Sequence, residues 1–250
     1  MIYLILDDAP ASRYLEEILS HAGLAWRRAD ARSLDDPRAI VVLAGTATLD
    51  AGERDRLAHL VRHGAALVVS GGTAGLDDVL GTSCAEPREG YLTEPDVGHP
   101  ITAGMPAPLH VFQARPLRWS TGTPLASLAD ASAVTITGAG VVANRHHRGA
   151  TVTLAPDIAA SVLHIQLGRE IHEDGTPAPD GTAPIDEGIL KTDDGVVLSW
   201  EHDRIRLTLD APLPDCPGKD PAYPDGDTPW FGRPVADELR LLLLQAIAWA

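Results

Sequence analysis

The feature that most constrains this chain is an alternation of short apolar runs with helical patterns near its start. Three runs of aliphatic residues are too short for helices and suit strands buried on both faces: 2–6, 39–43 and 65–69. Apolar residues at helical spacing lie between them, over 14–19 and 49–63, and Asp50 is a suitable N-cap. Alternating strands and helices imply parallel strands joined by right-handed crossovers. We therefore predict an α/β fold with an open, mainly parallel, doubly wound sheet.

Changes of pattern divide the chain into three predicted parts. Residues 1–168 form the α/β core, which includes a less regular stretch of loops and short strands over 81–118, a strand at 149–154 and a helix at 158–168. Residues 169–233 are rich in Asp, Gly and Pro, which predicts an irregular acidic lobe with a hairpin near 189–200. Residues 234–250 read as a strongly apolar helix that packs on the core.

Charge and composition exclude several classes of partner. Thirty-five acidic and twenty basic residues give a net charge of -15, which repels nucleic acid and anionic membrane surfaces. No apolar run is long enough to span a bilayer, and no basic leader precedes the first strand, so we expect a cytoplasmic protein. Cys84 and Cys216 have no metal-ligand spacing, and we expect neither a metal nor a cofactor.

The sharpest candidate site is the turn after the third predicted strand, Leu67-Val-Val-Ser-Gly-Gly72. Open α/β sheets bind ligands at the carboxyl ends of their strands, and a strand that turns sharply at glycines presents one side chain there. Ser70 would occupy the nucleophile position of such an elbow, but the pattern V-x-S-x-G is not the full elbow motif and favours a structural turn with Ser70 bonded to backbone. The binding candidates are Asp7, Ser70, Gly71, Gly72 and His99.

This arrangement resembles the class I glutamine amidotransferase-like superfamily. The segments that carry the resemblance are 60–69, Gly98-His-Pro-Ile-Thr102 and 144–157, together with the elbow. They are similar to the amidotransferase-like domains that accompany carbohydrate-active enzymes, such as the trimerisation domain of certain β-galactosidases. The resemblance implies a flavodoxin-like core, a carbohydrate ligand, and either a homo-oligomer or a downstream catalytic domain of polysaccharide-deacetylase type beyond residue 250.

The same resemblance implies a degenerate active site. The family has a cysteine at the elbow and a His-Pro-Glu segment after a late strand. Here Ser70 stands in the cysteine position, and Leu154-Ala-Pro-Asp157 places Ala155 in the histidine position and Asp157 in that of the glutamate. Because alanine cannot accept a proton, the glutaminase mechanism would be lost. The leading prediction is a non-catalytic accessory, binding or assembly module, in which Ser70 and Asp157 are vestigial.

Two alternatives remain open at the level of sequence. The chain would be a hydrolase if His99 or His164 reached Ser70, with Asp157 or Asp7 orienting the histidine, because triads are defined by geometry rather than by chain order. It would be an oligomeric or ligand-binding scaffold if the four leucines 241–244 formed a subunit contact.

Overall fold

The computed structural model describes residues 1–167 and 235–250. Residues 1–163 and 235–250 belong to one compact unit, so the C-terminal helix is part of the same body as the sheet. The predicted acidic lobe 169–233, with its hairpin near 189–200, lies outside the described residues. The domain boundaries proposed at 168 and 234 therefore stay predictions.

One half of the sheet is parallel. Its strand order is β2 (Trp26–Arg28), β1 (Ile2–Ile5), β3 (Ile40–Ala44), β4 (Ala66–Ser70) and β11 (Gly149–Leu154). All four pairings between these neighbours are parallel. Every residue of β4 and β11 is buried, which explains why their sequences are continuous small or apolar runs without alternation. The predicted α/β class is confirmed by this half.

The other half of the sheet is antiparallel. From β11 it continues through β10 (Ile136–His146), β9 (Thr123–Ala129), β6 (Arg88–Thr93) and β7 (Leu109–Ala114), while β5 (Thr82–Cys84) pairs with β8 (Leu117–Trp119). The sheet is thus mixed, which corrects the prediction of a mainly parallel one. Asn144, Arg145 and His146 are the last residues of β10.

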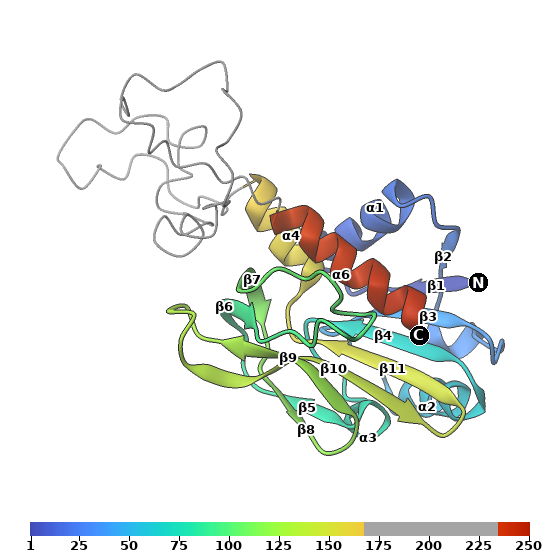
Figure 1. Cartoon of the computed structure of the whole chain (residues 1–250). Helices are drawn as coiled ribbons and strands as arrows, with labels where there is room; N and C mark the ends of the chain where they lie inside the picture. The colour runs from blue at the N-terminus through green and yellow to red at the C-terminus, as the bar shows by residue number, and fades with distance from the viewer. Residues whose placement is uncertain (168–234) are drawn as a thin grey trace, which may run out of the picture. The chain divides into compact units, whose positions relative to one another are not determined.

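Helices lie on both sides of the parallel strands. The described ones are α1 (Tyr14–His21), α2 (Ala51–His63), α3 (Asp77–Leu80), α4 (Ile158–Leu167) and α6 (Val235–Trp249), with short 3-10 turns at Pro10–Arg13 and Ala31–Ser33. Figure 1 shows α1, α4 and α6 on one side of the sheet and α2 and α3 on the other. The helices expected over 14–19, 49–63, 158–168 and 234–250 are confirmed with small changes of boundary.

The core beneath α2 is formed by residues at helical spacing in α2 and by alternate residues of the strands below it. Leu57, Leu60 and Val61 of α2 pack against alternate residues of β3 and β4, among them Leu43 and Leu67. On the other side, α6 buries one apolar stripe: Val235, Leu239, Leu242, Leu243, Ala246 and Ile247. Of the four consecutive leucines, 242 and 243 are buried in this chain while Leu241 remains 45% exposed.

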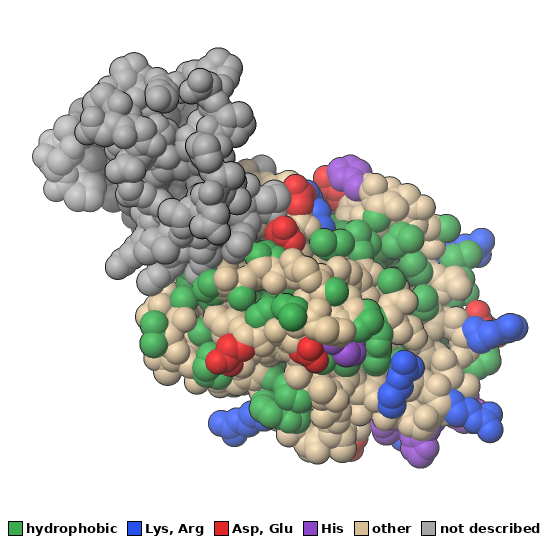
Figure 2. Space-filling view, in the orientation of Figure 1, with side chains coloured by type: hydrophobic (Ala, Val, Ile, Leu, Met, Phe, Trp, Pro, Cys, Tyr) green, Lys and Arg blue, Asp and Glu red, His purple; other side chains and the backbone are tan. Residues whose placement is uncertain are grey.

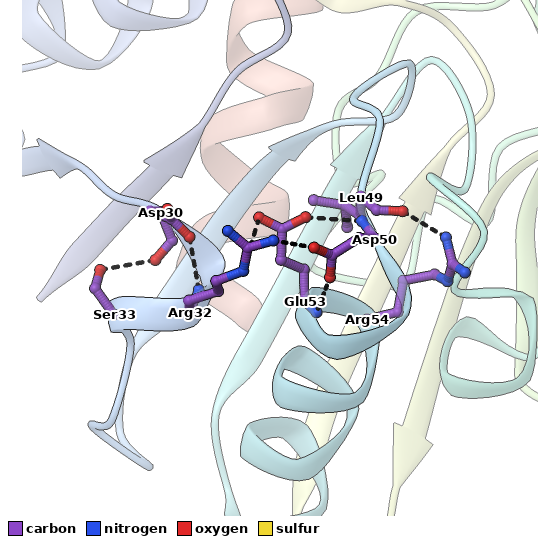
Figure 3. Close-up of polar contacts among 7 residues, drawn as sticks. All are labelled: Asp30, Arg32, Ser33, Leu49, Asp50, Glu53 and Arg54. Carbon is purple, nitrogen blue, oxygen red and sulfur yellow. Dashed lines mark hydrogen bonds and ion pairs between the residues drawn. The ribbon is translucent and has the colours of Figure 1, made fainter.

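A polar network fixes the beginning of α2, as Figure 3 shows. Asp50 Oδ1 accepts from the Glu53 amide at 2.9 Å, and Glu53 Oε2 accepts from the Asp50 amide at 2.7 Å, which is a complete capping box. The predicted N-cap is therefore confirmed. Arg32 forms an ion pair with the Asp50 carboxylate. The backbone bond from Glu53 and then the Arg32 guanidinium lower the pKa of Asp50.

Candidate functional site

The predicted elbow is present where β4 ends at Ser70. Gly71 has a φ of 83°, and a Cβ there would lie 2.8 Å from the Cβ of Asp157, so both its conformation and its surroundings require glycine. A Cβ on Gly72 would lie 2.6 Å from the carbonyl oxygen of Gly45. The Gly71 amide donates to the Leu154 carbonyl at 3.0 Å, so it is not available to an oxyanion. The tight turn therefore lies directly against the loop after β3 and the segment after β11.

The Ser70 hydroxyl is fully occupied by backbone groups. Its Oγ donates to the Pro156 carbonyl at 3.0 Å and accepts from the Ile158 amide at 2.9 Å, and the side chain is 3% exposed. A nucleophilic serine directs its proton toward a base, and no histidine of the described residues hydrogen-bonds to this oxygen. The geometry is that of a clamp, in which one hydroxyl joins the end of β4 to the first residue of α4.

The segment after β11 supplies the other half of this clamp. Ala155 is fully buried, and its amide and carbonyl bond to the Gly140 carbonyl and the Arg115 amide, each at 2.8 Å. Asp157 Oδ1 accepts from the Ala160 amide at 3.0 Å and so caps the first turn of α4. The structure therefore brings the two vestigial candidates, Ser70 and Asp157, to the same helix terminus. Both satisfy backbone amides that the helix leaves unbonded.

Asp7 lies at the end of β1 and serves a different pair of loops. Its Oδ1 accepts from the Ala9 amide at 3.0 Å and from the Ser12 hydroxyl, and its Oδ2 accepts from the Thr46 hydroxyl. These bonds tie the loop after β1 to the loop after β3. Asp7 thus stands at the carboxyl end of the parallel strands, as predicted, but its described bonds do not reach Ser70.

The two histidines considered as bases lie elsewhere. His99 sits in the loop before β7, where Nδ1 accepts from the Ile101 amide at 3.3 Å and the ring centroid is 5.5 Å from that of Trp249 in α6. His164 follows Ile158 by six residues, about 9 Å along the axis of α4. The hydrogen bonds of the described residues assemble no triad around Ser70 from either histidine.

A buried histidine–carboxylate pair is the polar feature that sequence reasoning missed. His110 on β7 is 2% exposed, and its Nε2 lies 2.9 Å from Glu89 Oε1 on β6. Its ring stacks between Tyr91 and Phe112, with centroids 4.5 Å away on each side. The signal would have been the cross-strand pairing of Tyr91 with His110, but that pairing follows from strands β6 and β7, which the sequence did not define.

Two further features concern possible metal ligands and membrane-spanning helices among the described residues. Residues 1–167 and 235–250 contain no group of three or more His, Cys, Asp or Glu side chains placed to hold a metal ion. None of the helices in these ranges combines the length and the apolar character that crossing a bilayer requires.

Comparison with known proteins supports the fold. No protein-family model and no curated protein matches the sequence. The chain superposes on the cold-adapted β-galactosidase from Rahnella sp. R3 with a TM-score of 0.51 and 17% identity, covering 73% of this chain and 33% of that chain. It therefore spans about a third of that enzyme. At this identity the likeness shows a shared fold.

Two weaker superpositions were also found. A ThuA-like protein from Bacteroides uniformis aligns with a TM-score of 0.49 and 11% identity over 62% of this chain and 81% of that chain. The carbohydrate deacetylase Agd3 aligns with a TM-score of 0.44 and 16% identity over 65% of this chain and 30% of that chain. Neither superposition adds to what the β-galactosidase comparison shows.

Proposed function

We propose that this chain is a non-catalytic amidotransferase-like module that serves carbohydrate processing by binding or assembly. The observation that carries the proposal is the engagement of the Ser70 hydroxyl by the Pro156 carbonyl and the Ile158 amide. A group that holds a helix terminus in place is not free to attack a substrate. The chain forms the sharp turn of an elbow, and the side chain of Ser70 at that turn has a structural role.

The neighbouring chemistry agrees with this assignment. Ala155, at the position that the family resemblance gives to the catalytic histidine, carries no titratable group and is fully buried. One carboxylate oxygen of Asp157 accepts a hydrogen bond from the Ala160 amide. No histidine or carboxylate of the described residues hydrogen-bonds to Ser70 Oγ, as the general base of acyl transfer through that serine would need to do.

The link to carbohydrate rests on the kind of protein in which this fold occurs. The likeness to about a third of a β-galactosidase is what a domain of a larger carbohydrate-active protein would show. We further propose that the module works either as a homo-oligomer or beside a catalytic domain of deacetylase type. In the oligomeric form, Leu241 on α6, which is 45% exposed, is one of the described apolar side chains available for a subunit contact.

The test combines an activity assay with a binding assay. The wild-type protein and Ser70→Ala are assayed for hydrolysis of glutamine and of p-nitrophenyl esters, and both are applied to an array of neutral oligosaccharides. We expect no hydrolysis that depends on Ser70, and binding of at least one neutral glycan by both proteins. Hydrolysis by the wild type that disappears in a folded Ser70→Ala variant would overturn the proposal. The absence of binding to every oligosaccharide of the array, in a protein that is also monomeric, would overturn it too.

A further inference from the structure

A cluster of basic side chains occupies the end of the sheet opposite the elbow. Helix α2 ends there at His63, and β10 turns into β11 there at residues 147–148. We call these residues the basic cluster: Arg56, His59, Arg62, His63, His146, His147 and Arg148. Figure 2 shows blue and purple side chains gathered at the lower right, over the end of the sheet where α2 is labelled in Figure 1.

The members of the basic cluster are close enough to act on one another. The Arg148 amide donates to the Arg62 carbonyl at 3.4 Å, so the two arginines project from adjoining backbone. The rings of His59 and His63 lie 4.1 Å apart, and those of His146 and His147 lie 4.8 Å apart. Charge on His63 lowers the pKa of His59, and burial lowers the pKa of His146, with further contributions from Arg62 to both.

The backbone holds this cluster in one geometry. Gly149 begins β11, and a Cβ placed on it would collide with the carbonyl oxygens of both Val61 and Ala65. The start of β11 is therefore seated directly on the backbone at the end of α2. Because this backbone is already ordered, binding of an anion would cost conformational freedom only in the side chains, which favours recognition.

The positive charge of the cluster is not neutralised by the described residues. Among the described arginines, only Arg28, Arg32 and Arg240 form ion pairs with carboxylates. No carboxylate in the described ranges lies within 4.0 Å of a side-chain nitrogen of Arg56, Arg62 or Arg148. What distinguishes the cluster is that Arg62 and Arg148 lie side by side among histidines and without an acidic partner among the described residues, which makes this surface of an acidic chain suited to an external anion.

We infer that the basic cluster binds a polysaccharide that carries carboxylate groups. This inference rests on the proposed function, which supplies carbohydrate as the ligand class, and it adds the charge of that ligand. Guanidinium groups bind carboxylates in bidentate fashion, and imidazoles add hydrogen bonds. A duplex nucleic acid carries a charge every ~1.7 Å, so the rest of this acidic protein repels it. A uronate polymer has one carboxylate per sugar and meets far less repulsion.

The test uses two forms of one polymer. Polygalacturonate and its fully methyl-esterified form share a backbone and differ in charge, and their binding is measured by isothermal titration calorimetry at low and at moderate salt. We expect the free acid to bind and the ester to bind at least tenfold more weakly. The affinity for the free acid should fall as salt rises, because exposed ion pairs are screened.

A matched pair of variants locates the binding surface. Arg62→Gln with Arg148→Gln removes two cations from the basic cluster, and Arg13→Gln with Arg27→Gln removes two exposed cations from other parts of the chain. The first pair should weaken binding of polygalacturonate roughly tenfold and flatten its salt dependence, since it removes two exposed ion pairs. The second pair should leave both within about twofold. Thermal melts of both variants establish that each is folded.

Three other outcomes would each overturn the inference, and each leaves a different conclusion about the ligand. Equal binding of the acid and the ester, or equal effects of the two variant pairs, would overturn the inference while carbohydrate binding stands. Tighter binding of a DNA duplex than of polygalacturonate, lost in the first pair, would overturn it by assigning the cluster to another polyanion. Binding of neutral glycans by both variant pairs without any binding of polygalacturonate would overturn it and leave the proposed function intact.

Discussion

The two ends of the parallel sheet use polar side chains in opposite ways. At the carboxyl end, Ser70, Asp157 and Asp7 all bond to groups of the chain itself: Ser70 joins β4 to α4, Asp157 caps α4, and Asp7 joins the loop after β1 to the loop after β3. At the amino end, Arg62 and Arg148 project from a rigid hairpin-and-helix junction, and no described carboxylate pairs with them. Ligands of α/β folds usually bind at the carboxyl ends of the strands. In this protein, two arginines without a carboxylate partner among the described residues lie at the other end.

The largest loss of stability is expected from adding a methyl group at Gly149, where β11 contacts the end of α2. Gly149→Ala should destabilise the protein by about 1–3 kcal/mol or more, because the new methyl group meets two backbone carbonyls that cannot rotate away. Gly52→Ala in the first turn of α2 is the control: its Cβ would only approach Asp50 Oδ1 at 3.4 Å, so stability should be unchanged or slightly higher. Chemical denaturation measures both, and equal effects would refute the tight seat proposed for the hairpin.

A smaller effect is expected at the carboxyl end. Ser70→Ala removes a buried hydroxyl and leaves the Pro156 carbonyl and the Ile158 amide without their partner, which should cost about 1–3 kcal/mol. Ser20→Ala removes an exposed hydroxyl that accepts from Trp26 Nε1 and should cost less than about 0.5 kcal/mol. The two free energies of unfolding are compared in urea. A Ser70→Ala variant as stable as the wild type would contradict the clamp.

The N-cap of α2 should contribute less than the clamp. Asp50→Ala breaks the capping box and the ion pair with Arg32, and should cost ~1 kcal/mol. Asp50→Asn keeps a capping oxygen and loses the charge, so most of the stability should remain, because exposed ion pairs contribute little. Melting temperatures of the two variants distinguish the cap from the charge. Equal losses would assign the effect to the ion pair instead.

The smallest effect is a dependence of stability on pH at the basic cluster. The pKa values of His59 and His146 are lowered in the folded protein, so the folded state binds fewer protons than the unfolded chain. This contribution to stability is present above the ordinary histidine pKa of 6.5 and is lost as pH falls through the lowered values. Arg62→Gln should therefore lose less stability than the wild type between pH 7.5 and 5.0. An identical loss in both proteins would show that Arg62 does not act on these histidines.

The parallel half of the fold could be predicted from sequence because its signals are local. Apolar runs, helical spacing and the Asp50 cap all lie within a few neighbouring residues. The antiparallel half could not, because β10 contains Gly138, Ala139 and Gly140, which have weak strand preference and are held in the sheet by partners far away in sequence. Pairing of this kind overrides local propensity.

The candidate site divides in the same way. The position of Ser70 at a sharp turn follows from Gly71 and Gly72, and sequence located it correctly. The use of its hydroxyl depends on Pro156 and Ile158, which lie 86 and 88 residues further along the chain. The basic cluster is likewise divided between α2 and the hairpin of β10 and β11, and only the pairing of β11 beside β4 brings the two together.

The central claim is that the serine of the elbow is structural, and its reactivity tests this most directly. The folded protein is treated with an organofluorophosphonate, which labels activated serines, and peptide mass spectrometry then examines Ser70. The bonds from Ser70 Oγ to Pro156 and Ile158 predict no label on this residue under conditions that label a serine hydrolase control completely. Stoichiometric labelling of Ser70 that is lost when the protein is unfolded would contradict the account and identify the chain as a hydrolase.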